Sequence, residues 1–427
     1  MTLIYRALTN ILYPLLVILI FYRKFIKKED ALRYKEKIFT SHFNTKRKGK
    51  SKLVWFHAAS VGELKSILPL MSELNKKKNN LKFLLTTVTL SSGNLAEKEL
   101  KTFNNVYHRY FPLDVKFLIQ KFILSWKPDK IILVDSEIWP NLILIANENN
   151  IPMAIINARI THKTYNRWKL IPNTAKKIFG SFSLCLTSNY ETKKYLTKFK
   201  VRKIIFSGNI KLINKTTQIT TIKRNKEVLK NNKVWCATNT HKGEDNFFLH
   251  THIKLKEKLK SLITIIAPRH INRVKEIKNL CENLKLNSQI LNKNNKIIKN
   301  KEVIIINSYG ELSNYYNVAK SVFVGKSTLL KLKNSGGQSP IEAAQLGCKI
   351  YHGPYVYNFK EIYNILKQHN ISKQIKSPQQ LAKNLFTDFK NVNKRSNKCS
   401  IIMNNLRNKT LNKTMKNINK FLFDENI

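Results

Sequence analysis

The sequence predicts an α/β protein in which two similar halves, each built on a parallel β-sheet, follow a short N-terminal membrane anchor. Short apolar runs rich in β-branched residues alternate with helical patterns along most of the chain, as they do in βαβ units. This alternating series occurs twice, and a polar stretch rich in Thr, Lys and Asn separates the two occurrences. At the N-terminus, one apolar run precedes a basic cluster.

The N-terminal segment, residues 1–28, is the expected anchor. Residues 7–22 are mostly apolar, and the basic flank 23–28 follows them. The run is somewhat short of the ~20 residues that cross a bilayer comfortably. Because no small-x-small cleavage site follows it, we interpret it as an uncleaved anchor and not as a removed signal peptide. The positive-inside rule places everything after it in the cytoplasm, and a buried or interfacial helix is the alternative.

The first half, residues 29–212, is expected to form a Rossmann-like domain with parallel strands. The expected strands are 53–56, 81–88, 130–135, 152–157 and 203–207.

The first of these strands leads into the stretch on which the functional prediction depends. After it, Gly62 allows a tight turn, and apolar residues at helical spacing begin at Leu64. Glu63 therefore lies in the first turn of a helix, at the carboxyl end of a strand, where α/β sheets bind ligands. The helix dipole favours an ionised carboxylate there, so Glu63 is a candidate general base. The alternative is an ordinary first-turn residue.

Other expected strands of this half also end in polar clusters. Asp135 and Glu137 precede Trp139, and Lys211 closes the half. Pro140 suits the first turn of a helix. The hydroxyl-rich run 86–93 is interpreted as a helix N-cap.

The polar stretch 213–233 is interpreted as a linker, and residues 234–390 as a second Rossmann-like domain. Its expected strands begin at Val234, Leu262, Val303 and Val322. The Lys- and Asn-rich tail, residues 391–427, is expected to be helical.

In the second half, Arg269 follows a strand and has the planar donors that match a phosphate. The pair Gly336-Gly337 leads into a helix, where backbone N–H groups can approach a phosphate or ribose. Glu342 either accepts hydrogen bonds from ribose hydroxyls or caps its helix. The Gly325-Lys326-Ser327 run is not a P-loop, because that motif needs a glycine at the position that Lys320 occupies.

Composition narrows the class of protein. The 427 residues suffice for two domains, and 77 Lys+Arg against 26 Asp+Glu give a formal net charge of +51. This excess suggests a polyanionic partner, although Lys, Asn and Ile are all over-used, as in compositional drift. Five scattered cysteines indicate a reducing compartment and argue against a zinc site. No nucleic-acid partner is expected, because no arginine-rich arm, zinc finger or RNP motif is present.

Together these stretches resemble the Kdo transferases (3-deoxy-D-manno-octulosonic acid transferases) of lipid A and lipopolysaccharide biosynthesis. The matching motifs run in order from the anchor to about residue 362. They are HAASVGE at 57–63, SEIWPN at 136–141, GNIK at 208–211, THKGE at 240–244, PRH at 268–270, YGEL at 309–312, GGQSPIE at 336–342, GP at 353–354 and NF at 358–359.

The resemblance implies a GT-B glycosyltransferase fold, in which two Rossmann-like domains face a cleft. It implies inverting transfer of Kdo from CMP-Kdo to a lipid A precursor (lipid IVA), without a metal or other cofactor. Glu63 would be the general base, and Glu137 and Lys211 would stabilise the transition state. The residues implied to bind CMP are Pro268, Arg269, Tyr309, Gly310, Glu311, Ser339, Pro340, Ile341 and Glu342.

The resemblance also implies a place at the cell inner membrane, with a single N-terminal anchor and the catalytic body on the cytoplasmic side. The acceptor would meet residues 29–212 and the nucleotide residues 234–390. Basic residues beside the anchor would attract anionic membrane lipids.

The sequence departs from the family pattern at three places. Asn307-Ser308 replaces the usual Asp-Thr, Lys326 stands in a usual Gly-Gly-Ser, and Ser339 replaces an asparagine. These changes affect the expected nucleotide contacts and leave Glu63 and Arg269 untouched. Two alternatives stay open: a GT-B enzyme that uses another nucleotide sugar, and a non-enzymatic, basic, membrane-anchored binding protein.

Overall fold

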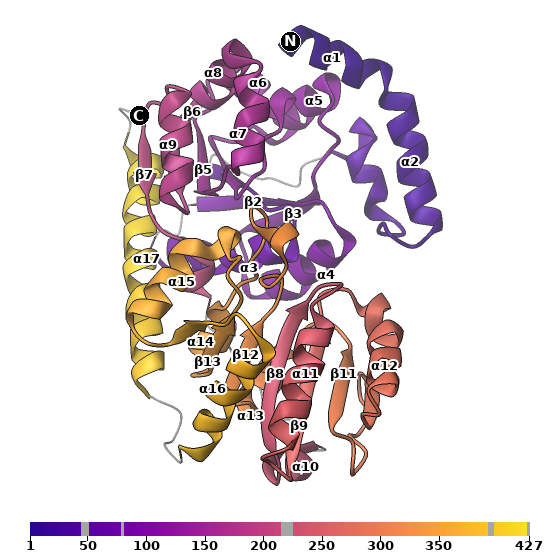
Figure 1. The fold of residues 1–427 in the computed structure, drawn as a ribbon. Coiled ribbons are helices and arrows are strands. Elements are labelled where there is room, and N and C mark those ends of the chain that lie inside the picture. Colours follow the sequence, from indigo (N-terminus) through magenta and orange to yellow (C-terminus); the bar gives the residue numbers. More distant parts are fainter. Residues whose placement is uncertain (44–50, 78–80, 215–224, 392–396, 425–427) are drawn as a thin grey trace. The chain divides into compact units, whose positions relative to one another are not determined.

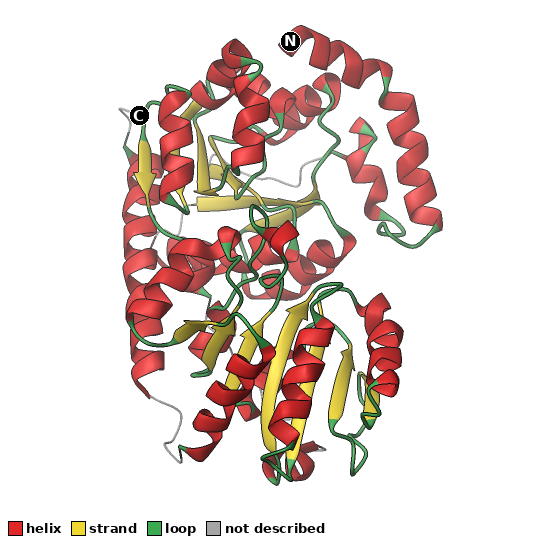
Figure 2. Ribbon diagram, in the orientation of Figure 1, coloured by secondary structure: helices red, strands yellow, loops and turns green. Residues whose placement is uncertain are grey.

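The computed structural model describes residues 1–43, 51–77, 81–214, 225–391 and 397–424 (Figure 1). The chain divides into two compact units, Met1–Asn214 with Arg407–Ile427 and Lys215–Leu406. Each unit contains one seven-stranded sheet, and helices cover the sheets (Figure 2).

The first sheet is parallel throughout, with the strand order β3-β2-β1-β4-β5-β6-β7. Its strands are β1 (Lys52–His57), β2 (Leu81–Thr87), β3 (Val106–Tyr110), β4 (Lys130–Val134), β5 (Met153–Ala158), β6 (Phe182–Thr187) and β7 (Ile204–Phe206). The helices that follow them are α3 (Val61–Lys77), α4 (Leu90–Glu99), α5 (Lys116–Trp126), α6 (Pro140–Glu148), α7 (His162–Lys169), α8 (Pro172–Gly180) and α9 (Tyr190–Lys198).

Strand β1 shows why the sequence reads as a continuous apolar run. Leu53 and Trp55 pack into one hydrophobic cluster, whereas Val54 and Phe56 pack into another. Successive side chains of a strand point to opposite faces, and a parallel sheet between helices buries both of them. The continuous apolar run therefore indicates that β1 is an interior strand of the sheet, as observed.

The second sheet is also parallel, with the strand order β10-β11-β9-β8-β12-β13-β14. Its strands are β8 (Lys233–Thr240), β9 (Leu262–Pro268), β10 (Ser288–Asn292), β11 (Val303–Asn307), β12 (Ser321–Val324), β13 (Lys349–His352) and β14 (Ser372–Gln374). Its helices are α10 (Lys226–Lys230), α11 (Asp245–Lys256), α12 (Val274–Asn283), α13 (Leu312–Val318), α14 (Ile341–Gln345), α15 (Lys360–Gln368) and α16 (Pro378–Lys390).

The expected strands are all present, and the structure adds strands that the sequence pattern did not predict. The added strands are β3, β6, β10, β13 and β14. Three of them, β3, β10 and β14, are edge strands, and β3 and β10 have several partly exposed positions. Strand β14 has the sequence Ser-Lys-Gln and no apolar residue. Such strands are held by their neighbour's backbone and carry little hydrophobic signal of their own.

The expected anchor forms two helices, α1 (Thr2–Ile11) and α2 (Tyr13–Phe25). In the described part of the chain, no single helix is long and apolar enough to cross a membrane. The two helices of this pair, which are bent by 55°, reach that length and apolarity only when they are counted together. The pair exposes many large apolar side chains. They are Leu3, Ile4, Leu8, Ile11, Leu12, Leu15, Ile18, Leu19, Phe21, Tyr22 and Phe25.

The expected linker and tail fall partly outside the described residues, at 215–224, 392–396 and 425–427. The tail contains the long helix α17 (Asn397–Phe423), and the division between the two units falls within it. Its last turns pack into a hydrophobic cluster of the first unit through Met415, Ile418 and Phe421.

Candidate active site

The candidate site of the first unit lies where the strand order reverses. Strand β1 pairs with β2 on one side and with β4 on the other, so the connections after β1 and β4 leave in opposite directions. Such a switch point, at the carboxyl ends of the strands, is where open α/β sheets bind ligands. Glu63 follows β1, and Asp135 and Glu137 follow β4.

Glu63 lies in the first turn of α3, as the sequence predicts. Its carboxylate accepts hydrogen bonds from the Ala59 N–H at 2.8 Å and from the Ser60 hydroxyl at 2.8 Å. The Glu63 N–H donates to Ser60 Oγ at 3.4 Å, so that the Ser60 side chain caps the start of α3. A first-turn capping residue would make these contacts too, so the contacts alone do not separate the two interpretations.

The environment of Glu63 changes the protonation equilibrium of its carboxyl. The pKa of its carboxyl is raised to about 7, chiefly by burial and also by the nearby carboxylates of Glu137 and Asp135, against the lowering effect of the Ser60 and Ala59 hydrogen bonds. Burial disfavours the charged form of this carboxyl and therefore opposes the helix dipole, whose own effect on Glu63 stays a prediction. A carboxylate with a pKa near 7 suits proton abstraction at neutral pH.

Glu137 belongs to an aromatic and imidazole cluster. Its Oε2 accepts a hydrogen bond from Trp139 Nε1 at 2.8 Å and lies 3.4 Å from Nε2 of His57. The buried His57 ring contacts Thr86 Oγ1 through Nδ1 at 2.9 Å and packs on Phe111, with ring centroids 4.2 Å apart. These contacts hold Glu137 beside the end of β1.

Lys211 reaches the same strand ends from a short 3-10 helix, Ile210–Ile213. Its Nζ lies 3.5 Å from Asp135 Oδ2. Asn157, at the end of β5, accepts a hydrogen bond from the Ile210 N–H at 3.1 Å and so fixes the start of that helix. Asp135 and Asn157 both have positive φ angles, of 63° and 55°, a conformation that Asn and Asp tolerate better than most residues.

The structure thus brings Glu63, Glu137 and Lys211 to one strand edge, together with Asp135. From the sequence, Asp135 is a carboxylate at a strand end with no role assigned to it. The sequence feature that points to it is the pair of carboxylates, Asp135 and Glu137, that precedes Trp139. The roles of His57 and Asn157 depend on contacts across the sheet, so no local pattern could reveal them.

Some residues of the matching motifs support the fold. The Asp114 carboxylate accepts hydrogen bonds from the backbone N–H groups of Asn141 and Leu142, at 3.0 and 2.9 Å, and thereby caps α6. The first residue of α6 is Pro140, as the sequence predicts. Thr89 and Ser92 form a capping box on α4, which confirms the capping interpretation of the run 86–93.

In the second unit, the residues implied to bind CMP lie in three places. Two of these places are the carboxyl ends of β9 and β11, and the third is the segment that follows β12. Pro268 ends β9, and the exposed Arg269 follows it. Strand β11 pairs with β9, so Tyr309, Gly310 and Glu311 come beside them, and the Ile271 N–H donates to the Tyr309 hydroxyl at 3.5 Å.

The segment from Ser339 to Glu342 reaches the helix that follows β11. Ser313, in α13, donates a hydrogen bond to the Glu342 carboxylate. Glu342 therefore links α13 to α14, whose N-terminus has no side-chain cap. The capping alternative for Glu342 is wrong, and its ribose role stays a prediction.

The paired glycines serve chain packing. The Gly336 N–H donates to the Leu332 carbonyl, and the Gly337 N–H donates to the Lys326 carbonyl, both at 2.6 Å. A Cβ on Gly336 would lie 2.4 Å from the Tyr355 carbonyl oxygen. The N–H groups of the two glycines therefore already bond within the chain, and the approach of the following helix start to a phosphate or ribose stays a prediction.

The connection after β12 binds an internal carboxylate. The fully buried Glu244 accepts hydrogen bonds from the N–H groups of Lys326, Ser327 and Thr328, at 2.6, 2.8 and 3.0 Å. It also accepts from the Thr328 hydroxyl and the His241 N–H. The Gly-Lys-Ser run thus folds around a glutamate, which agrees with its rejection as a P-loop.

Among the residues that the structure describes, no three His, Cys, Asp or Glu side chains are grouped so that they could hold a metal ion. All five cysteines are free and buried.

Comparison with known proteins places this site in a family. Residues 33–214 match the model of the 3-deoxy-D-manno-octulosonic-acid transferase (kdotransferase) N-terminal domain. The chain is 30% identical over 366 residues to a probable mitochondrial 3-deoxy-D-manno-octulosonic acid transferase of Arabidopsis thaliana, covering 83% of this chain and 80% of that one. It is 31% identical to the 3-deoxy-D-manno-octulosonic acid transferase of Haemophilus influenzae, over 72% of each chain.

The fold is that of GT-B glycosyltransferases, as expected. A glycosyltransferase from Rickettsia africae aligns with 88% of this chain and 100% of its own length, at a TM-score of 0.58 and 12% identity. At that identity the likeness concerns the fold alone. The sequence relatives go further, and with their coverage the chain belongs to the 3-deoxy-D-manno-octulosonic acid transferase family of glycosyltransferases.

Proposed function

We propose that this protein transfers Kdo from CMP-Kdo to a lipid A precursor such as lipid IVA, with inversion and without a metal. Membership of the transferase family supports the donor and the reaction class. The observation that carries the catalytic part is the position of Glu63 at the switch point, with a carboxyl pKa of about 7.

In the proposed reaction, Glu63 takes the proton of an acceptor hydroxyl. The hydroxyl oxygen attacks the anomeric carbon of Kdo as the bond to the CMP phosphate breaks, and CMP leaves with the bonding electron pair. A single displacement of this kind inverts the configuration at the anomeric carbon. Glu137 stabilises positive charge that develops on the sugar, and Lys211 stabilises negative charge on the leaving group.

The nucleotide role of the second unit rests on the resemblance and on the clustering of its strand ends. The exposed Arg269 is suited to a phosphate because its guanidinium offers parallel donors. Tyr309 is also exposed, at 59%, and is suited to contact a sugar or base.

The helix pair α1–α2 is proposed to attach the protein to the cell inner membrane. Its exposed apolar side chains and the basic residues 23–28 form the combination that binds an anionic lipid surface. The bend of 55° favours a pair that lies in the interface as much as one that crosses the bilayer. Membrane attachment would keep the enzyme beside a lipid acceptor.

The experiment is an assay of purified protein with CMP-Kdo, tetra-acylated lipid A precursor and EDTA. CMP release and the product mass are measured for the wild type and for Glu63→Gln. We expect product from the wild type and a loss of about 10²–10⁴-fold in the variant.

Each part of the proposal can fail separately in this assay. A folded wild type that releases no CMP would contradict the donor assignment, and a screen of other nucleotide sugars would then test the alternative GT-B enzyme. Activity that disappears with EDTA and returns with a divalent cation would contradict the metal-independent mechanism. An unchanged rate in Glu63→Gln would contradict the choice of base.

A further inference from the structure

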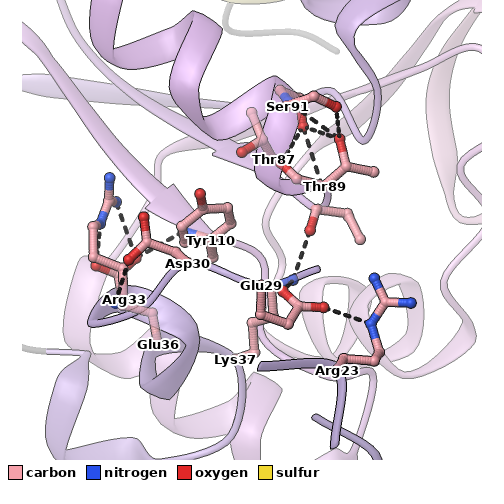
Figure 3. A network of polar contacts seen from close by, with 12 residues as sticks. Arg23, Glu29, Asp30, Arg33, Glu36, Lys37, Thr87, Thr89, Ser91 and Tyr110 are labelled. Atoms are coloured by element: carbon pink, nitrogen blue, oxygen red, sulfur yellow. Dashed lines mark hydrogen bonds and ion pairs between the residues drawn. The ribbon is translucent and has the colours of Figure 1, made fainter. Parts of the chain in front are cut away.

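A network of polar side chains, with the buried pair Glu29 and Lys37 at its centre, ties the N-terminal segment to the first sheet (Figure 3). Arg23, in the last turn of α2, donates from Nε to Glu29 Oε1 at 2.6 Å. Lys37 donates to the other carboxylate oxygen of Glu29. The Lys37 and Glu29 side chains are only 5% and 2% exposed. Removing both charges from water is costly, so this pair differs from an ordinary surface ion pair.

Lys37 also reaches the strand-end turns. Its Nζ donates to the Val88 carbonyl oxygen at 2.7 Å. The same turn also donates hydrogen bonds to the turn after β1. The Val88 N–H donates to the Ala59 carbonyl oxygen at 3.2 Å, and the Thr89 N–H donates to the same oxygen at 3.4 Å.

The same turn holds Glu63. The Ala59 N–H donates to Glu63 Oε2 at 2.8 Å. Polar contacts therefore run without a break from α2, through Glu29 and Lys37 and two backbone turns, to the carboxylate of the proposed base. All of these residues belong to the first unit.

We propose that Lys37 is a positioning residue for Glu63. By binding the Val88 carbonyl it fixes the turn after β2, and that turn fixes Ala59, whose N–H orients the carboxylate of the base. The Arg23–Glu29 contact extends this support to α2, so the N-terminal helix pair also steadies the catalytic turn. The inference rests on the proposed role of Glu63 and adds to it a residue that no motif indicated.

The groups around Lys37 and around Glu63 determine how a change at Lys37 would alter the pKa of Glu63. Glu29, Arg23 and Asp30 act on the charge of Lys37, which burial disfavours, and its ammonium lies 5.1 Å from the centre of the Tyr110 ring. Around Glu63 the groups are Ser60, Ala59, Glu137 and Asp135, and the Ala59 hydrogen bond lowers the pKa of Glu63. Weakening that bond should raise the pKa of the base above its already high value.

The test compares Lys37→Met with the matched control Lys35→Met, on the same short helix Arg33–Lys37 but exposed. We expect kcat of Lys37→Met to fall on the order of tenfold, with the rise of kcat with pH displaced to higher pH. Backbone amide exchange in the peptide 57–63 should become faster. Lys35→Met should match the wild type in all three measurements.

Because Lys37→Met leaves the buried Glu29 with Arg23 as its one remaining partner in this network, the variant can fail to fold. The double variant Glu29→Gln with Lys37→Met removes both charges and still lacks the Val88 contact. A positioning role predicts that the displaced pH profile and the faster exchange persist in the double variant.

Either folded variant with a wild-type pH profile and wild-type exchange at 57–63 overturns the proposal, whatever happens to the rate. Failure of the proposed function shows differently, as an inactive wild type or an unaffected Glu63→Gln. Amide exchange still decides the Lys37 inference in that case.

Discussion

Each unit places a glutamate near the start of the helix that follows a strand at which the order reverses, and the two glutamates differ in what surrounds them. Glu63 follows β1 and Glu244 follows β8, each beside the strand where the order reverses. Glu244 is fully buried and accepts five hydrogen bonds. Glu63 is partly exposed, accepts two, and faces two further carboxylates.

The number of donors decides what each carboxylate can do. Five donors hold the Glu244 carboxylate in one orientation, so that it joins the connection after β8 to the connection after β12. Two donors leave Glu63 free to bind a proton, and like charges nearby make that proton easier to hold. The same residue type at equivalent positions thus serves structure in one unit and is proposed to serve chemistry in the other.

The largest effect expected from this comparison is on activity. Glu63→Gln should lower kcat by about 10²–10⁴-fold, because a glutamine cannot accept the acceptor's proton. The variant should keep the melting temperature of the wild type within a few degrees at pH 6. A Glu63→Gln protein that unfolds there would place Glu63 with Glu244 as a structural residue.

The next effect is on stability. Glu244→Gln should lower the free energy of unfolding by about 2–4 kcal/mol, because one amide oxygen replaces two carboxylate oxygens and the amide N–H₂ group faces backbone donors. Urea denaturation measures this change, with Glu63→Gln as the matched control. Equal stability of the two variants would contradict the claim that Glu244 supports the structure more than Glu63 does.

A smaller effect concerns the pH dependence of stability. The folded-state pKa of Glu63 lies above its ordinary value, so its ionisation is harder in the folded state, and the stability that the protonated carboxyl contributes is lost as pH rises through about 7. We therefore expect the melting temperature of Glu63→Gln to gain on that of the wild type between pH 5 and pH 8. Thermal denaturation at both pH values measures the gain, and a constant difference would contradict the raised pKa.

The smallest expected effect is a shift in the pH dependence of kcat when the neighbouring Asp135 carboxylate is removed. Asp135→Asn removes one of the carboxylates that raise the pKa of Glu63 and releases Lys211 from its ion pair. Both changes favour ionised Glu63, so the rise of kcat with pH should move down by less than about one pH unit. A shift to higher pH would show that Asp135 acts in another way.

The sequence predicts most of the buried strands, although it misses the buried strand β6. Continuous apolar runs identify β1, β4 and β9, because both faces of these strands are covered. The strands β3 and β14 escape prediction because partly exposed edge strands and short strands need no apolar run. The bend between α1 and α2 also escapes, since the apolar run continues through it.

The candidate site is predictable only in part, for a related reason. Glu63 can be found locally, since a strand, a turn and a helix start adjoin it in the chain. The pKa of its carboxyl cannot, because burial and two residues some 70 positions away set it. Lys37 and Glu244 act through backbone groups of distant segments, and such contacts leave no pattern in the sequence around them.

The central claim is tested most directly by the pH dependence of kcat for the wild type, measured between pH 5 and 9 beside Glu63→Gln. If Glu63 is the base, kcat of the wild type rises with pH and levels off above an apparent pKa of about 7, and the residual rate of the variant lacks that rise. A wild-type profile without an inflection in this range, or the same inflection in the variant, would contradict the account.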